Sequence, residues 1–172
     1  MQKIIILSGN PGSGKTTIAK RLEEDGITRL SIDDFYQNSD RDSNINEWFR
    51  DEVFLDQSYK TFKTEILHQI ENGSDIIIET SGVGKRWMEM FAELKKEHPK
   101  NLITIYLQIP KEESLKRVAD RNQTDHPIKM DEERVNIFFE KSESILHDYD
   151  HVIDANRSID QIYEEIKSLI EE

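Results

Sequence analysis

The chain of 172 residues contains no cysteine, only four prolines and seven glycines, and no apolar run that approaches the roughly 20 residues needed to span a bilayer. Without cysteine, disulfides, thiolate metal sites and cysteine nucleophiles are excluded. The five histidines are scattered and lack metal-ligand spacing, which argues against zinc. No charged and then apolar signal segment begins the chain. We therefore expect a cytoplasmic protein with no membrane association.

Positive charge is also scarce, because 23 Lys and Arg residues face 35 Asp and Glu residues and the net charge is −12. Long polyanions should be repelled, so long nucleic acid is not an expected partner. A local basic pocket for small anions remains compatible with this balance. With no repeat and no Pro/Gly/Ser linker, residues 1–172 are predicted to form a single domain. The oligomeric state, monomer or homodimer, stays open.

Short apolar runs alternate with segments of helical period, which is typical of an α/β fold with a parallel sheet. The predicted strands are residues 3–8, 28–32, 75–79, 102–108 and 151–153. The predicted helices are residues 15–25, 44–71, 85–97, 111–121, 131–147 and 158–171. The longest helix is expected to break near Leu55 and Asp56. Residues 36–71 and the polar loop 122–130 depart from simple alternation and could cover the carboxyl edge of the sheet, where ligands of α/β proteins bind.

The strongest motif follows the first apolar run and matches G-x-x-x-x-G-K-[ST], the phosphate-binding P-loop. Its glycines let successive N–H groups point at phosphate oxygens, and the following helix adds its positive end. Lys15 can reach the β- and γ-phosphates, and the Thr16 hydroxyl can ligate Mg²⁺. The predicted nucleotide contacts are Gly9, Asn10, Pro11, Gly12, Ser13, Gly14, Lys15, Thr16 and Thr17.

Two acidic positions follow predicted strands. Asp33 and Asp34 come after the second strand, where a carboxylate could accept a proton from a substrate hydroxyl. Adjacent residues leaving a strand point in different directions, so at most one should face the site. Glu79 closes a run of three isoleucines in the manner of a Walker B acid that contacts Mg²⁺ directly or through water. A helix cap for the aspartates and an exposed strand end for Glu79 are the structural alternatives.

Two further groups could contact substrate. Ser81 and Gly82, with Arg86 after them, lie in a small turn that could approach a substrate or simply cap the next helix. Arg117 and Arg121 are four residues apart and share a helix face next to the polar loop. Such guanidinium groups can clamp phosphoryl oxygens during transfer. The alternative is a solvated face, with Glu113 as an ordinary helix partner of Arg117.

Together, the P-loop, the acidic pair and the two arginines resemble the P-loop kinase family. The resemblance is to its compact branch of polynucleotide, gluconate, shikimate and zeta-toxin-like kinases. It covers most of the chain and implies a three-layer α/β/α fold with a five-stranded parallel sheet in the order 2-3-1-4-5. It also implies a helical substrate-binding insertion at about 36–72 and a short lid at about 117–130.

The same resemblance implies roles for individual residues. Lys15 and Thr16 would hold ATP and Mg²⁺, and Asp33 would face the acceptor hydroxyl. Arg121, with Arg117 beside it, would contact the transferring phosphate. Asp154 and Asn156 lie in a segment that resembles the one beside adenine, although a plain β–α turn is the alternative. Tyr36 stands near the place where polynucleotide kinases have an arginine, and Ser81-Gly82-Val83-Gly84 only partly matches the glycine-rich segment of shikimate kinases.

The favoured function is therefore an ATP-dependent kinase that phosphorylates a hydroxyl of a small molecule, a nucleoside or sugar-like metabolite. One alternative is a kinase for polynucleotide 5′-hydroxyls or nucleoside monophosphates. Another is a regulatory ATPase without a kinase substrate. No N-K-x-D guanine-reading motif is present, which argues against an ordinary GTPase.

Overall fold

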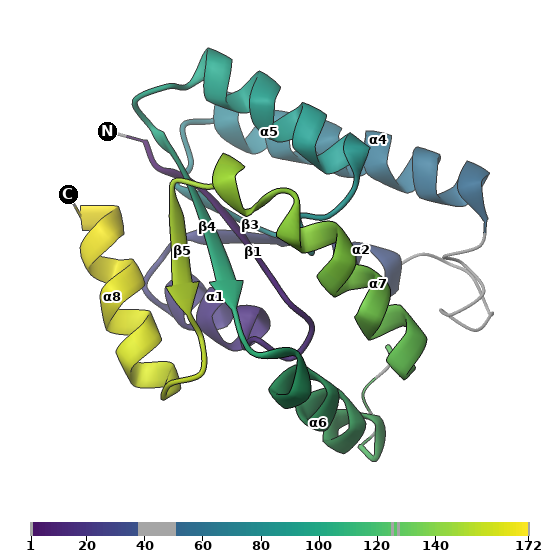
Figure 1. Ribbon diagram of the computed structural model, residues 1–172. Helices are drawn as coiled ribbons and strands as arrows, with labels where there is room; N and C mark the ends of the chain where they lie inside the picture. The colour runs from purple at the N-terminus through teal and green to yellow at the C-terminus, as the bar shows by residue number, and fades with distance from the viewer. Residues whose placement is uncertain (1, 38–50, 125, 127, 172) are drawn as a thin grey trace.

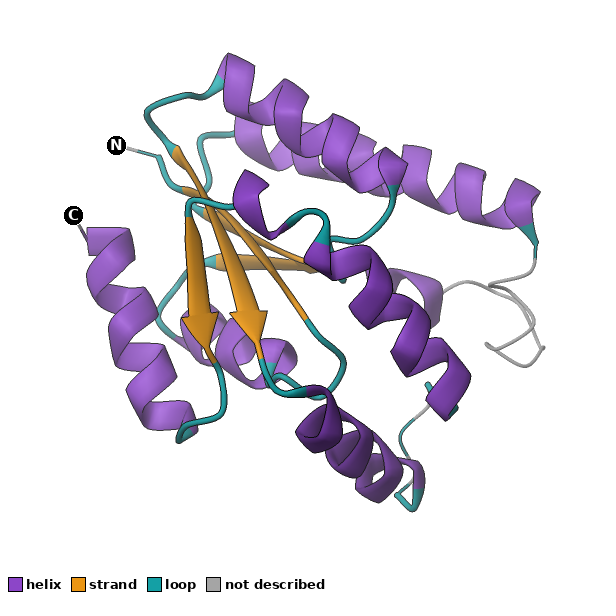
Figure 2. Cartoon of the chain, in the orientation of Figure 1, coloured by secondary structure: helices purple, strands orange, loops and turns teal. Residues whose placement is uncertain are grey.

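The computed structural model describes residues 2–37, 51–124, 126 and 128–171. Strands and helices alternate along the chain (Figure 1, Figure 2). In chain order the elements are β1 (Ile4–Gly9), α1 (Lys15–Glu24), β2 (Thr28–Ser31), α2 (Ile32–Gln37), α4 (Glu52–Glu71), β3 (Ile76–Glu79), α5 (Lys85–Glu97), β4 (Leu102–Gln108), α6 (Lys111–Asn122), α7 (Glu132–Glu143), the 3₁₀ turn η1 (Leu146–Asp148), β5 (His151–Asp154) and α8 (Ile159–Glu171).

The described strands form a five-stranded parallel sheet in the order β2-β3-β1-β4-β5, which confirms the predicted order. In the register, Ile4 of β1 pairs with Ile76 on one side and with Leu102 on the other. All six residues of β1 are buried, as expected for a central strand covered on both faces. The chain changes direction across the sheet at β1, so a ligand crevice is expected at the carboxyl end of this strand.

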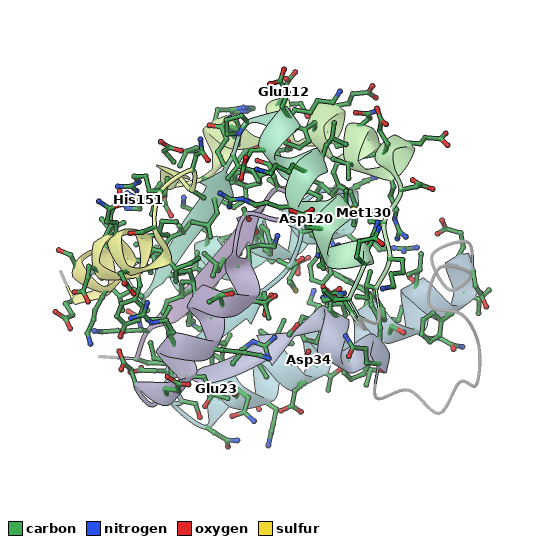
Figure 3. All side chains as sticks on the ribbon, turned by 90° about the horizontal axis from the view of Figure 1, so that it is seen from below. Glu23, Asp34, Glu112, Asp120, Met130 and His151 are labelled. Carbon is green, nitrogen blue, oxygen red and sulfur yellow. The ribbon has the colours of Figure 1, made fainter. Side chains whose placement is uncertain are left out.

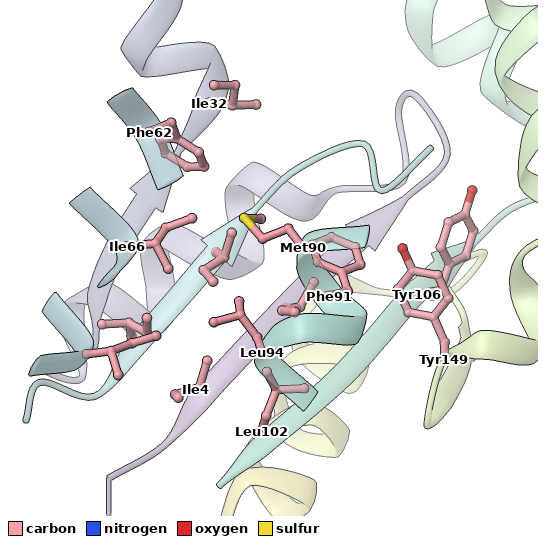
Figure 4. Close-up of a cluster of buried hydrophobic side chains, with 14 of the residues drawn as sticks. Ile4, Ile32, Phe62, Ile66, Met90, Phe91, Leu94, Leu102, Tyr106 and Tyr149 are labelled. Carbon is pink, nitrogen blue, oxygen red and sulfur yellow. The ribbon is translucent and has the colours of Figure 1, made fainter. Parts of the chain in front are cut away.

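Alternate residues of β1 face two different apolar layers. Ile4 and Ile6 join a cluster with residues of α4 and α5, including Ile66 of α4 and Phe91 of α5 (Figure 4). Ile5 and Leu7 join a second cluster with residues of α1 and α8. In Figure 1, α4 and α5 accordingly lie on one side of the sheet, and α1 and α8 lie on the other. Among the described residues, no helix is long and apolar enough to cross a membrane.

The predicted break at Leu55 and Asp56 is wrong, because α4 is continuous from Glu52 to Glu71. Asp51 caps the helix by accepting the Phe54 N–H at 3.0 Å. Asp56 forms an ion pair with Lys60 at 2.7 Å, an i,i+4 spacing that favours the helix. The part of the predicted helix at residues 44–50 lies outside the described residues.

Two other predicted boundaries shift because side chains bond locally to the backbone. The second strand ends at Ser31 instead of residue 32, and the Ser31 hydroxyl accepts the Asp34 N–H at 3.5 Å as α2 begins. Helix α7 ends at Glu143 instead of residue 147. Near that end, Ser142 and Ser144 donate to the carbonyls of Phe139 and Lys141 at 3.0 and 2.9 Å. Such side-chain bonds compete with helix continuation.

Candidate active site

A pocket of about 970 Å³ opens at the carboxyl end of the sheet. Figure 3 looks onto this end of the molecule, with Asp34 on α2 and Met130 after α6 labelled. The P-loop, α2, α4, the segment after β3, α6 and α7 all contribute to its wall. The lining residues are Gly9, Pro11, Gly12, Gly14, Lys15, Thr16, Thr17, Ile32, Asp33, Tyr36, Glu52, Leu55, Tyr59, Glu79, Thr80, Ser81, Val83, Gly84, Lys85, Arg86, Trp87, Arg117, Arg121, His126, Ile128, Met130, Arg134, Ile137, Phe138 and Lys141.

The P-loop needs its glycines for two reasons. Gly12 and Gly14 have φ values of 75° and 91°, in the left-handed region that side chains other than glycine rarely adopt. A Cβ at Gly12 would also lie 3.1 Å from the Cβ of Arg117, so helix α6 packs directly on the loop. The Ser13 N–H donates to the Asn10 carbonyl at 3.1 Å and closes the turn before α1.

Lys15 bends back over its own loop. Its ammonium donates to the carbonyls of Gly9 and Asn10 at 2.9 and 3.0 Å. Burial lowers the pKa of Lys15 to about 8, although Glu79 and Asp33 attract the charged form. Lys15 is therefore a cation at the phosphate-binding loop at neutral pH. It loses its proton as the pH rises through about 8.

The two adjacent aspartates face different surroundings. Asp33 lines the pocket, where desolvation and repulsion from Glu79 raise the pKa of its carboxyl group against the opposing charges of Lys15 and Arg121. Asp34 points away from the pocket and pairs with Arg29 at 2.5 Å. The expectation that at most one of the pair faces the site agrees with this arrangement.

Glu79 is buried at the end of β3, with 4% of its side chain exposed. Its Oε1 accepts the hydroxyl of Thr16, and its Oε2 accepts the Nη2 of Arg29 at 2.6 Å. The predicted Walker B carboxylate and the P-loop threonine are thus in direct contact.

The two arginines of α6 have different partners. Arg117 donates to Glu113 at 2.6 Å, to the Gly12 carbonyl at 3.2 Å and to Asn156 at 3.4 Å. The Nε and Nη2 atoms of Arg121 are buried, and neither has a hydrogen-bond partner within the described part of the chain. Burial lowers the pKa of Arg121, while Asp33 opposes that shift. Arg121 therefore has buried donors available in the same pocket as Asp33 and Lys15.

The segment after β3 lines the pocket with residues 80, 81 and 83–87. Ser81 and Arg86 line the pocket, but Gly82 packs behind the wall against Ser8 and Tyr149. Beside them, Tyr36, Leu55, Tyr59, Val83 and Trp87 form an apolar stretch of the same wall. Tyr59 is held by its hydroxyl, which donates to the Arg86 carbonyl at 2.9 Å.

The loop after α6 is closed at its base by Asn122. The amide of this residue donates to the Met130 carbonyl at 2.7 Å and accepts the Met130 N–H at 3.2 Å. His126, Ile128 and Met130 line the pocket from this loop. Residues 125 and 127 of the predicted lid lie outside the described residues.

Some predicted contacts are not part of the pocket lining. The Asn10 side chain is buried and donates to Tyr106 and Ser142 at 3.1 and 3.4 Å, so it supports the P-loop from behind. Ser13 is buried as well. Asp154 and Asn156 form a turn in which the Asn156 N–H donates to Asp154 at 2.9 Å, next to Arg117.

The pocket wall is basic although the chain is acidic. Seven of its lining residues are Lys or Arg (Lys15, Lys85, Arg86, Arg117, Arg121, Arg134, Lys141), and three are Asp or Glu (Asp33, Glu52, Glu79). Sequence reasoning missed Arg29, Arg134 and Lys141. Only the fold brings Arg134 and Lys141 to the pocket wall and Arg29 to Glu79 behind it, because no motif marks an arginine in a short strand or cations on an amphipathic helix.

This fold and this loop define a P-loop nucleotide-binding domain. A family model described as "AAA domain" matches residues 5–143, more than half of the chain, and the protein belongs to this family of P-loop domains.

Its relatives and structural neighbours include P-loop kinases. A shikimate kinase of Clostridium botulinum (strain Langeland / NCTC 10281 / Type F) is 27% identical over 124 residues, which are 72% of this chain and 69% of the relative. The solved structure of a sugar kinase from Janibacter sp. HTCC2649 superposes with a TM-score of 0.74 at 18% identity, over 99% of this chain and 95% of that chain. A shikimate kinase from Acinetobacter baumannii, solved with shikimate, gives a TM-score of 0.71 at 22% identity, over 99% and 93% of the two chains.

Proposed function

We propose that this protein transfers the γ-phosphate of ATP to a hydroxyl group of a small molecule. The observation that carries the proposal is a pocket in which Asp33 lies with Lys15 of the P-loop and Arg121 of α6, close enough for their charges to shift one another's pKa. A donor site for phosphate and a carboxylate for an acceptor hydroxyl are the two halves that such a transfer needs. Kinases among the relatives support the same class of reaction.

In this mechanism the P-loop N–H groups and Lys15 bind the β- and γ-phosphates. Asp33 orients the acceptor hydroxyl and takes its proton as the oxygen bonds to the γ-phosphorus and the bond to the β–γ bridging oxygen breaks. Arg121, with Arg117 beside it, stabilises the negative charge on the transferring group. The raised pKa of Asp33 suits a group that must accept a proton near neutral pH.

The residues present fit a Mg²⁺ ion bound together with ATP. Among the described residues, no group of three or more His, Cys, Asp or Glu side chains could hold a metal alone. The Thr16 hydroxyl and Glu79 carboxylate are instead in contact beside the P-loop, and Mg²⁺ usually takes few protein oxygens together with phosphates and water. When bound, the ion would neutralise phosphate charge. Thr16 would ligate it and Glu79 would contact it directly or through water.

The acceptor would lie on the far side of Asp33 from the P-loop. Ser81 and Arg86 offer polar contacts there, and Tyr36, Tyr59 and Trp87 offer apolar surface. We propose that the helical segment at about 36–72 and the lid at about 117–130 exclude water during transfer, since an open site would hydrolyse ATP. Shikimate and sugars are the first acceptors to test, because relatives and neighbours are named for them.

The test is ADP release measured with a panel of hydroxyl compounds, including shikimate, gluconate, sugars and nucleosides. At least one compound should raise ADP formation tenfold or more above the rate with ATP alone, and the product should carry the transferred phosphate. Fast ATP turnover that no acceptor changes would instead favour a regulatory ATPase. Stimulation only by a polynucleotide 5′-hydroxyl or a nucleoside monophosphate would reassign the acceptor class.

A further inference from the structure

Arg29 is a buried cation outside the pocket lining that no motif identified. It lies on β2, where its Cα pairs in register with Ile77, two residues before Glu79. Its side chain is 6% exposed and extends toward the carboxyl end of the sheet. There its Nε and Nη2 donate to Glu79 Oε2 at 2.9 and 2.6 Å, and its Nη1 donates to Asp34 at 2.5 Å.

These bonds divide the two oxygens of Glu79 between two partners. Both bonds from Arg29 go to Oε2, whereas Oε1 accepts the hydroxyl of Thr16. A planar guanidinium fork sets the direction of a carboxylate more strictly than an ammonium group can. With Oε2 held from the β2 side, Oε1 is turned toward the P-loop.

Asp34 anchors the other end of the same guanidinium. Its carboxylate is half exposed and takes no part in the pocket lining, so its role in this cluster is to hold Arg29 in place from the first turn of α2. Arg29 also offsets the cost of burying Glu79, because a buried carboxylate without a partner is strongly unfavourable.

We infer that Arg29 is a positioning residue for the divalent ion that accompanies the nucleotide. It acts through Glu79, whose Oε1 it aims at the Thr16 hydroxyl, and it does not itself contact nucleotide or acceptor. The inference rests on the proposed function in one respect, namely that Thr16 and Glu79 face the ion. It adds that the affinity for the metal ion depends on Arg29, which lies on β2 next to the strand that carries Glu79.

The experiment measures Mn²⁺ binding to the complex of the full chain with ADP, by the electron paramagnetic resonance signal of free Mn²⁺. Arg29→Gln removes the cation, Arg29→Lys keeps the charge without the fork, and Arg21→Lys serves as a control at an exposed pair with Asp160. Circular dichroism and thermal melting establish that each variant is folded, and ADP affinity is measured separately in EDTA.

Loss of a residue that orients a metal ligand typically weakens metal affinity about 10–100-fold. We expect a loss of that size for Arg29→Gln, a smaller one for Arg29→Lys and none for Arg21→Lys, with ADP affinity in EDTA unchanged within about twofold. If Arg29→Gln does not fold, Arg29→Lys decides alone.

Unchanged Mn²⁺ affinity in the folded variants would overturn the inference. An equal loss of ADP affinity in EDTA would also overturn it, since Arg29 would then merely stabilise the fold. So would a wild-type complex that binds no more Mn²⁺ than ADP alone. The measurement uses no acceptor, so a failure to find kinase activity would remove the proposed function without changing this result.

Discussion

Single residues in this protein take their roles from the side of the backbone on which they lie. Asp33 and Asp34 are chemically identical neighbours, but Asp33 faces Lys15 and Arg121 across the pocket and Asp34 faces Arg29. The same sequence signal thus yields one carboxylate that lines the pocket and one that pairs with an arginine. The two can be separated by mutation.

Asp33→Asn should lower kcat about 10²–10⁴-fold, the usual contribution of a general base, while ATP affinity stays within a few-fold. Steady-state kinetics with the identified acceptor and a direct ATP-binding titration measure the two effects. Asp34→Asn is the matched control and should cost much less kcat. A loss of ATP binding in Asp33→Asn would indicate that Asp33 binds the metal instead of acting as the base. Equal kcat losses in the two variants would show that Asp33 is not the base.

The lowered pKa of Lys15 predicts that nucleotide binding depends on pH. The pKa of this group is about 8 in the unliganded protein, below its ordinary value, so the ammonium is charged below pH 8 and loses its proton above it. Bound phosphate favours the charged form, and binding above pH 8 must therefore take up a proton. The apparent ATP affinity should fall by up to about tenfold per pH unit above pH 8.

Calorimetric titrations from pH 7 to 9.5, in buffers of different ionisation enthalpy, measure both the affinity and the proton uptake. Lys15→Arg stays charged over this range and should bind ATP with a flatter profile. Identical slopes for the two proteins would show that another group is responsible.

At the scale of elements, close packing joins segments that are distant in the chain. Gly82, after β3, lies against Ser8 of β1 and Tyr149 near β5, with φ of 69° and the Tyr149 hydroxyl donating to its carbonyl at 3.4 Å. A Cβ at this position would lie 2.6 Å from that of Ser8 and collide with the Tyr149 hydroxyl. Glycine therefore lets the segment after β3 pack closely against Ser8 of β1 and Tyr149.

Gly82→Ala should lower the free energy of unfolding more than Gly73→Ala does. Gly73 has a similar φ of 76° but nothing within 4 Å of an added Cβ, so it isolates the backbone cost of about 1–2 kcal/mol. The collision at Gly82 should add about 1–3 kcal/mol. Urea unfolding of both variants measures the difference. Equal losses would mean that Ser8 and Tyr149 move aside without strain.

At the scale of the whole molecule, one sheet is stabilised by an apolar layer on each face. Ile66 is fully buried in the layer between the sheet and α4, whereas Val53 of the same helix is 67% exposed. The chain is acidic as a whole, whereas Lys and Arg outnumber Asp and Glu in the pocket lining.

Ile66→Ala should lower the free energy of unfolding by about 2–5 kcal/mol, because it removes buried apolar surface and leaves a cavity. Val53→Ala, in the same helix, should change it by less than about 0.5 kcal/mol. Chemical denaturation followed by circular dichroism measures both. Similar small losses would show that the α4 layer is loosely packed.

The sequence by itself determined the features that depend on neighbours in the chain. The alternation of strands and helices follows from local hydrophobic period, and the P-loop is a contiguous motif whose glycines serve a local turn. The resemblance to P-loop kinases supplied the sheet order. The break expected near Leu55 and Asp56 is absent because Asp56 pairs with Lys60 and Leu55 packs against the core.

Only the tertiary structure decided which polar side chains meet. Arg29 and Glu79 are 50 residues apart, and their contact requires the pairing of β2 with β3. Whether the side chain of Asp33 faces the pocket depends on the exact residue at which β2 ends and α2 begins. Asn10 turns from the nucleotide-binding loop to Tyr106, 96 residues away. Such contacts are set by the packing of distant elements, which no local pattern in the chain encodes.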